Sequence, residues 1–91
     1  MKYEFSAPYT FEEQVYTEID LDLDSLKGSD IANVTREWTR AGNMSMMKTT
    51  DDTFCTLLAA KAAKLHVEFF EQLPAKDYIQ ITTMVAGFLH N

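Results

Sequence analysis

Apolar and polar residues alternate in two stretches near the start of the chain. The alternation covers residues 3–7 and, over a longer run, residues 14–23. A period of two is typical of a half-buried β-strand. In the second stretch one predicted face consists of Val15, Thr17, Ile19, Leu21 and Leu23, and the other of Tyr16, Glu18, Asp20 and Asp22. The pattern predicts an antiparallel β-hairpin whose connection lies at residues 8–13.

From residue 29 onward the apolar positions recur with helical spacing. Principal helices are predicted over residues 29–41, 51–65 and 74–89, with a short helical segment at residues 67–73. Their apolar stripes are Ile31, Val34, Trp38 and Ala41; then Phe54, Leu57, Leu58, Ala62 and Leu65; and finally Tyr78, Ile81, Met84, Val85, Phe88 and Leu89.

The ends of these helices are also marked in the sequence. Gly42 with Asn43 provides a C-terminal stop, Thr49 or Thr50 can cap the second helix, and Pro74 fits the start of the last one. An isolated hairpin is barely stable, so its apolar face is expected to lie on the helices. The sequence predicts one α+β domain over residues 1–91: an N-terminal β-hairpin (1–23) packed on three main α-helices plus one short helix (24–91).

Charge and cysteine content limit the kinds of partner. Fourteen acidic residues against eight basic ones leave a net charge of −6, which repels phosphate backbones and argues against nucleic-acid binding. The single cysteine excludes an internal disulfide and fits a reducing cytoplasm. No apolar run approaches the roughly 20 residues of a membrane span, and the N-terminus does not resemble a signal peptide. We therefore expect a cytoplasmic protein without a membrane partner.

The acids at residues 20, 22 and 24 have the spacing with which a calcium loop begins. The pattern then fails, because Ser25 replaces the glycine of the sixth position and Ile31 replaces the glutamate of the twelfth. His66, His90 and Cys55 cannot supply the ligands of a structural zinc site, and Cys55 has no orienting partner legible in the sequence. We predict no catalytic residue, cofactor or metal site, and hence a protein that is not an enzyme.

Five residues are candidates for binding a partner. Met44, Met46 and Met47 lie in the connection after the first helix, and methionine-rich surfaces adapt to varied apolar partners. Phe69 and Phe70 are expected to be partly uncovered, because so small a domain cannot cover every large apolar side chain. An uncovered patch would indicate a homo-oligomer or a partner protein.

Three stretches, in order, resemble the phage tail assembly chaperones of the family named for its E, 41 and 14 members. Residues 26–31 (Leu-Lys-Gly-Ser-Asp-Ile) are similar to its first helix opening, residues 57–73 to its alanine-rich helix and following turn, and residues 73–78 (Leu-Pro-Ala-Lys-Asp-Tyr) to its last motif. Two residues depart from the pattern. Lys27 replaces a common capping threonine, and His66 replaces a usual proline.

The resemblance implies a tail assembly chaperone of a phage or prophage. Such a protein would bind the tape measure protein and keep it soluble in the cytoplasm of the bacterial host, and it would be absent from the mature virion. The resemblance also implies a frameshift-extended form of the same chain as a partner. An acidic inhibitor that mimics nucleic acid and blocks a host DNA-binding enzyme is the alternative that the net charge leaves open.

Overall fold

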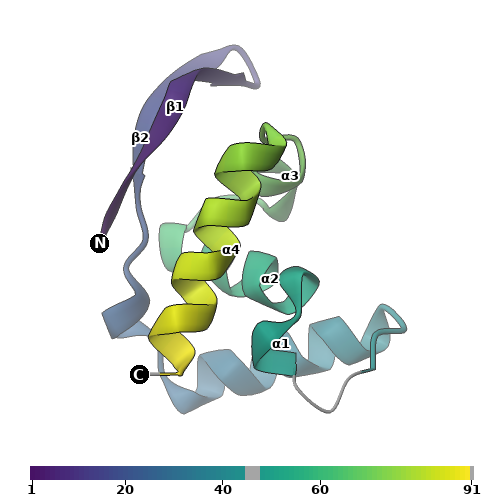
Figure 1. The fold of residues 1–91 in the computed structure, drawn as a ribbon. Coiled ribbons are helices and arrows are strands. Elements are labelled where there is room, and N and C mark those ends of the chain that lie inside the picture. Colours follow the sequence, from purple (N-terminus) through teal and green to yellow (C-terminus); the bar gives the residue numbers. More distant parts are fainter. Residues whose placement is uncertain (45–47, 91) are drawn as a thin grey trace.

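The computed structural model describes residues 1–44 and 48–90, which form a β-hairpin followed by helices (Figure 1). The hairpin consists of β1 (Lys2–Phe11) and β2 (Gln14–Asp20). The main helices are α1 (Gly28–Arg40), α2 (Asp52–Ala63) and α4 (Ala75–Leu89), with the short α3 (Val67–Glu71) and the 3₁₀ turns η1 (Leu23–Ser25) and η2 (Lys48–Thr50). The predicted α+β class, with a hairpin, three main helices and one short helix, is confirmed.

The hairpin is longer than the sequence pattern predicts at its first strand and shorter at its second. β1 continues through Pro8 to Phe11, and the connection is only Glu12–Glu13. Both of these residues have positive φ, 49° and 66°, which is the backbone of a two-residue hairpin turn. The strands pair from Phe11 with Gln14 to Lys2 with Asp20. The expectation of a connection at residues 8–13 is therefore wrong.

A bulge divides the hairpin and changes which side chains face the helices. Four residues of β1 separate Glu4 from Tyr9, whereas only Thr17 separates their partners on β2. Such an insertion bends the strand, and it tolerates proline because the ladder is interrupted there. Beyond the bulge Tyr16 faces the helices and Val15 is 61% exposed, so the predicted period-two face is wrong at this end.

Phe69 of α3 lies at the centre of the contact between the hairpin and the helices. Its ring centroid lies within 4.8–6.1 Å of five other aromatic rings, four of them from the hairpin. The Tyr9 hydroxyl also donates to the Phe69 carbonyl at 2.8 Å. The five ring partners are Phe5, Tyr9, Phe11, Tyr16 and Phe70.

The helix α2 occupies the middle of the helical part, with α1, α3 and α4 packed around it. Most of its side chains are buried, including Phe54, Leu58 and Ala59. The prediction of a single apolar stripe underestimates this burial. The small side chains Ala59 and Ala62 are buried here too, and small residues allow neighbouring elements to approach closely.

The ends of the helices are fixed by side chains that the sequence only partly identifies. Asp51, rather than a threonine, caps α2 by accepting from the Phe54 N–H at 3.0 Å, and it also accepts from the Trp38 indole at 3.0 Å. His66 Nδ1 accepts from the Glu68 N–H at 3.2 Å. The histidine that departs from the family pattern thus provides a cap for α3.

Asp77, in the first turn of α4, connects this helix to the bulge of β1. Its carboxylate accepts from the Tyr3 hydroxyl at 2.6 Å, the Ser6 N–H at 3.1 Å and the Ser6 hydroxyl at 3.0 Å. Ser6 lies in the bulge of β1 and has no paired residue on β2, so its N–H can donate to a side chain of α4. The aspartate of the motif Leu-Pro-Ala-Lys-Asp thus makes a buried hydrogen-bonded contact between the two ends of the sequence. We call this contact of Asp77 with Tyr3 and Ser6 the tether.

Burial and hydrogen bonding act in opposite directions on this carboxyl group. Burial alone would raise the pKa of Asp77, whose side chain is 1% exposed. The hydrogen bonds from Tyr3 and Ser6, together with the charge of Lys76, outweigh burial and hold the pKa below its ordinary value. Burial of the phenol, followed by its hydrogen bond to Asp77 and the charge of that carboxylate, raises the pKa of Tyr3 to about 12.

Candidate binding groove

Phe69 and Phe70 do not form the uncovered surface that the sequence predicts. They are 0% and 1% exposed, because hairpin side chains cover Phe69 and Phe70 packs against the Phe69 ring. Phe69 thereby joins the hairpin to the helices.

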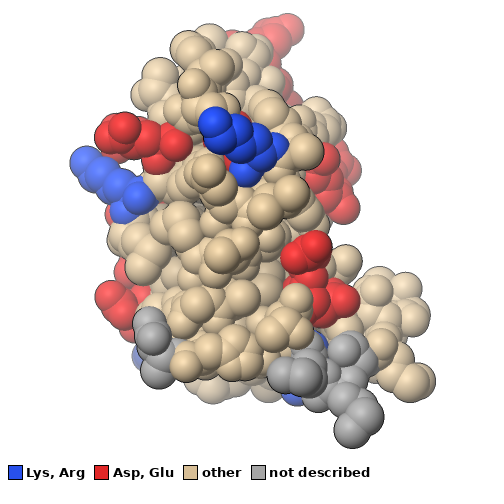
Figure 2. Space-filling view, in the orientation of Figure 1, with Lys and Arg blue, Asp and Glu red and all other residues tan. Residues whose placement is uncertain are grey.

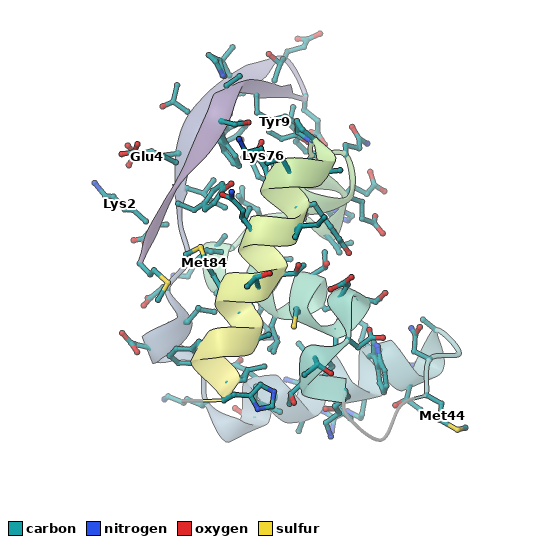
Figure 3. All side chains as sticks on the ribbon, viewed as in Figure 1. Lys2, Glu4, Tyr9, Met44, Lys76 and Met84 are labelled. Carbon is teal, nitrogen blue, oxygen red and sulfur yellow. The ribbon has the colours of Figure 1, made fainter. Side chains whose placement is uncertain are left out.

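Met44 lies on the surface beyond the end of α1, and its side chain is 95% exposed. In Figure 3 it points away from the rest of the molecule. Met46 and Met47 lie outside the residues that the structure describes. Of the five candidate residues, Met44 is the one that the structure places on open surface.

A groove that the sequence does not indicate runs across the helical part. It consists of three adjoining hollows of about 320, 270 and 270 Å³. The first shares Glu71 and Tyr78 with the second, and the second shares Glu37, Leu57 and Val67 with the third. The groove therefore extends from the start of α4, past α3, to the side of α1.

The floor of the groove is apolar and its rim is acidic. Leu57, Val67 and Tyr78 are half-buried along the floor, while the carboxylates of Glu37 and Glu71 stand exposed at its edge. Among the described lining residues the one lysine, Lys61, lies at the α1 end, 3.8 Å from Asp30. An apolar floor with acidic edges suits an amphipathic helix that carries basic residues beside its apolar stripe.

Contacts from the core hold the floor of this groove in place. The hydroxyls of Thr56 and Tyr78 lie 2.8 Å apart, and the Thr56 hydroxyl also donates to the Asp52 carbonyl at 2.7 Å. Tyr78 directly follows Asp77, so the tether to the hairpin also positions the tyrosine. The groove is thus a surface built on rigid elements, which is favourable for binding. Sequence reasoning assigned Leu57 and Tyr78 to the core because their helical spacing is that of core residues.

The thiol of Cys55 does not have the environment of a nucleophile. It is buried in α2, and burial, followed by the charges of Asp52 and Asp51, raises its pKa to about 11. A reactive cysteine needs the opposite shift. Within residues 1–44 and 48–90 no group of three or more His, Cys, Asp or Glu side chains could hold a metal ion, and no helix there is long and apolar enough to span a membrane.

The fold and this groove define a small α+β domain with an open apolar hollow on its helical side. The chain belongs to the phage tail assembly chaperone family described as "E, or 41 or 14", which matches residues 2–90. The match includes the hairpin, whereas the three stretches that carry the resemblance noted in the sequence begin only at residue 26. Neither the curated proteins nor the solved structures contain a significant match to this chain.

Proposed function

We propose that this protein is a non-enzymatic chaperone that binds helical segments of the tape measure protein in the groove between α1, α2, α3 and α4. Family membership supports the role in tail assembly. The open apolar floor formed by Leu57, Val67 and Tyr78 supports the mode of binding and is the observation on which the site depends. Met44 adds an adaptable contact, since it directly follows Asn43, which lines the α1 side of the groove.

The energetics of such a groove fit a chaperone that must later be displaced. A bound helix would gain about 25 cal/mol for each Å² of apolar surface that it covers in this groove. The loss of translational and rotational freedom on association offsets much of that gain. The net affinity is therefore modest for one groove. Several copies along a long helical partner would keep its apolar stripes covered, and each copy could still leave when tail-tube subunits replace it.

In this proposal the protein acts in the cytoplasm of the infected or lysogenic bacterium and does not remain in the mature virion. A frameshift-extended form that retains the groove residues would share this binding surface. It would add further contacts through its extension.

The test is co-expression with the tape measure protein, comparing the wild-type chain with Val67→Asp and with Val15→Asp as a matched control. Val67 lies on the groove floor at the first residue of α3, where an acidic side chain is compatible with the helix. Val15 is exposed on β2, so the control makes the same change in charge away from the groove. We expect Val67→Asp to weaken the complex at least 10-fold, and Val15→Asp to leave it unchanged.

The salt dependence of the complex separates the two functions considered above. A complex that survives high salt supports apolar binding in the groove, whereas one that is lost with added salt favours the acidic inhibitor. An unchanged complex with Val67→Asp would place the binding site elsewhere on the chain. No soluble complex at any salt concentration would refute the tape measure protein as the partner.

A further inference from the structure

The outward surface of α4 carries a stripe that the proposed function does not use. We define the outer stripe as Lys76, Ile79, Thr83, Gly87 and His90, all exposed and spaced three or four residues apart. No Asp, Glu, Lys or Arg occurs after Asp77 in the sequence. Figure 2 shows an uncharged column over α4, below Lys76 and with acidic side chains to either side. In a chain of net charge −6 an uncharged surface allows a second copy to approach this face with little repulsion.

Two residues of the outer stripe have no explanation in the packing of a single chain. Ile79 is 59% exposed, although it is a large apolar side chain in the second turn of a helix. Gly87 lies within the same helix, where alanine would be favoured, and a Cβ added there would meet nothing within 4 Å. The fold therefore requires neither the exposed isoleucine nor the absent side chain.

The positions of these two residues match under two-fold symmetry. Ile79 lies four residues before Thr83 and Gly87 lies four residues after it. If two α4 helices pack antiparallel with Thr83 on the axis, Ile79 of each copy lies opposite Gly87 of the other. The geometry points to a homodimer in which each Ile79 fills the open space above the partner's Gly87. The same surface then serves both copies, as closed two-fold symmetry requires.

Electrostatics favour the antiparallel arrangement over the parallel one. In an antiparallel pair the two helix dipoles point in opposite directions, which is favourable. With the two-fold axis at Thr83, Lys76 of one copy lies beside His90, the residue that caps the C-terminal end of the other α4. A lysine ammonium there is attracted by the terminal carbonyl groups. In a parallel arrangement Lys76 would instead lie against Lys76, and Ile79 against Ile79.

The size of the outer stripe predicts a weak dimer. Residues 76–90 span about 21 Å of helix, and a helix is about 10 Å wide, so the contact covers roughly 200 Å² of each copy. Stable interfaces cover about 800 Å² per partner. We therefore expect association only at high protein concentration. The outer stripe does not include any lining residue of the groove, so this dimer is independent of the proposed function.

Sedimentation of the purified chain up to about 1 mM tests the dimer. We expect wild type and Val15→Lys to dimerise, and Ile79→Lys and Gly87→Leu to remain monomeric. Gly87→Leu also raises the helix propensity of α4, so it should increase the melting temperature of the monomer while it abolishes the dimer. The double variant Ile79→Ala with Gly87→Leu again places a small residue opposite a large one and should restore association. A wild-type chain that stays monomeric at this concentration would refute the dimer.

Oxidative cross-linking tests the orientation. A cysteine introduced as Thr83→Cys, in a Cys55→Ser background, lies on the proposed axis and should form a disulfide between copies. Ile79→Cys should not, because the two Ile79 positions lie about 12 Å apart along the antiparallel pair. Cross-linking through Ile79→Cys but not Thr83→Cys would overturn the antiparallel arrangement. If neither Thr83→Cys nor Ile79→Cys forms a disulfide between copies and Ile79→Lys still dimerises, the contact lies on another surface.

Discussion

Replacing Asp77 by asparagine removes the charge of the tether and keeps its shape. The carboxylate accepts three hydrogen bonds, from the Tyr3 hydroxyl, the Ser6 N–H and the Ser6 hydroxyl. Hydrogen bonds to a charged group contribute about 1.5–3 kcal/mol each, and those at one site are not additive. The asparagine retains one acceptor oxygen. We therefore expect Asp77→Asn to lower the free energy of unfolding by about 2–3 kcal/mol, out of roughly 5–13 kcal/mol for a chain of this size.

Urea unfolding at pH 7, followed by circular dichroism, measures this loss. With a slope of about 1.5 kcal/mol per molar, the midpoint should fall by roughly 1.3–2 M. Asp20→Asn is the matched control, since it makes the same change in charge at an exposed acid that pairs with the Met1 amine at 3.1 Å. That variant should lose less than about 0.5 kcal/mol. Adding Ser6→Ala to Asp77→Asn should lower stability by less than the sum of the two single effects.

The pH dependence of the same variants gives an independent check. Because the folded-state pKa of Asp77 is lowered, the unfolded state binds more protons than the folded state near that pKa. The stabilisation is present above the unfolded pKa, at about 4, and is lost as the pH falls through the folded value. The difference in stability between wild type and Asp77→Asn should therefore shrink below pH 4. Equal midpoints at pH 7, or a difference that does not change with acid, would refute the tether.

Two further predictions concern the turn and the cysteine. Changing Glu12 and Glu13 to Asn-Gly should raise the free energy of unfolding by about 1 kcal/mol, because their positive φ angles strain residues with a Cβ; an unchanged urea midpoint would contradict this. Cys55 in the folded chain should react with a thiol reagent at pH 8 at least about 100-fold more slowly than a free thiol, since burial raises its pKa to about 11. A rapid reaction before denaturation would show that the thiol is accessible.

Most of the elements could be predicted from apolar periodicity, but the hairpin shows the limit of that method. Alternation identified both strands, yet it stopped β1 at residue 7 because Pro8 reads as a break. A bulge accommodates that proline and also places Tyr16, rather than Val15, against the helices. Periodicity within one strand cannot reveal an insertion in the pairing of two strands.

The binding surface was less predictable, for two reasons. Phe69 is covered by hairpin residues about 60 positions away in the sequence, and Phe70 is buried with it; that contact depends on the tertiary structure. The groove is formed where four helices leave Leu57, Val67 and Tyr78 incompletely covered, although the helical spacing of Leu57 and Tyr78 is that of core residues. Asp77 has the sequence position of an ordinary acid in a first helical turn, and its burial depends on Ser6 and Tyr3 far away in the chain.

The tether between Asp77 and β1 has a consequence for synthesis of the chain. The ribosome makes the hairpin first, but its anchor is 71 residues further on than Ser6, and its aromatic face needs Phe69 as well. A two-stranded hairpin has little stability alone, so the nascent N-terminal segment stays unanchored until α3 and the start of α4 emerge. Attachment of the hairpin is then a late step, and a chain interrupted before residue 77 would expose the aromatic side chains that the complete protein covers.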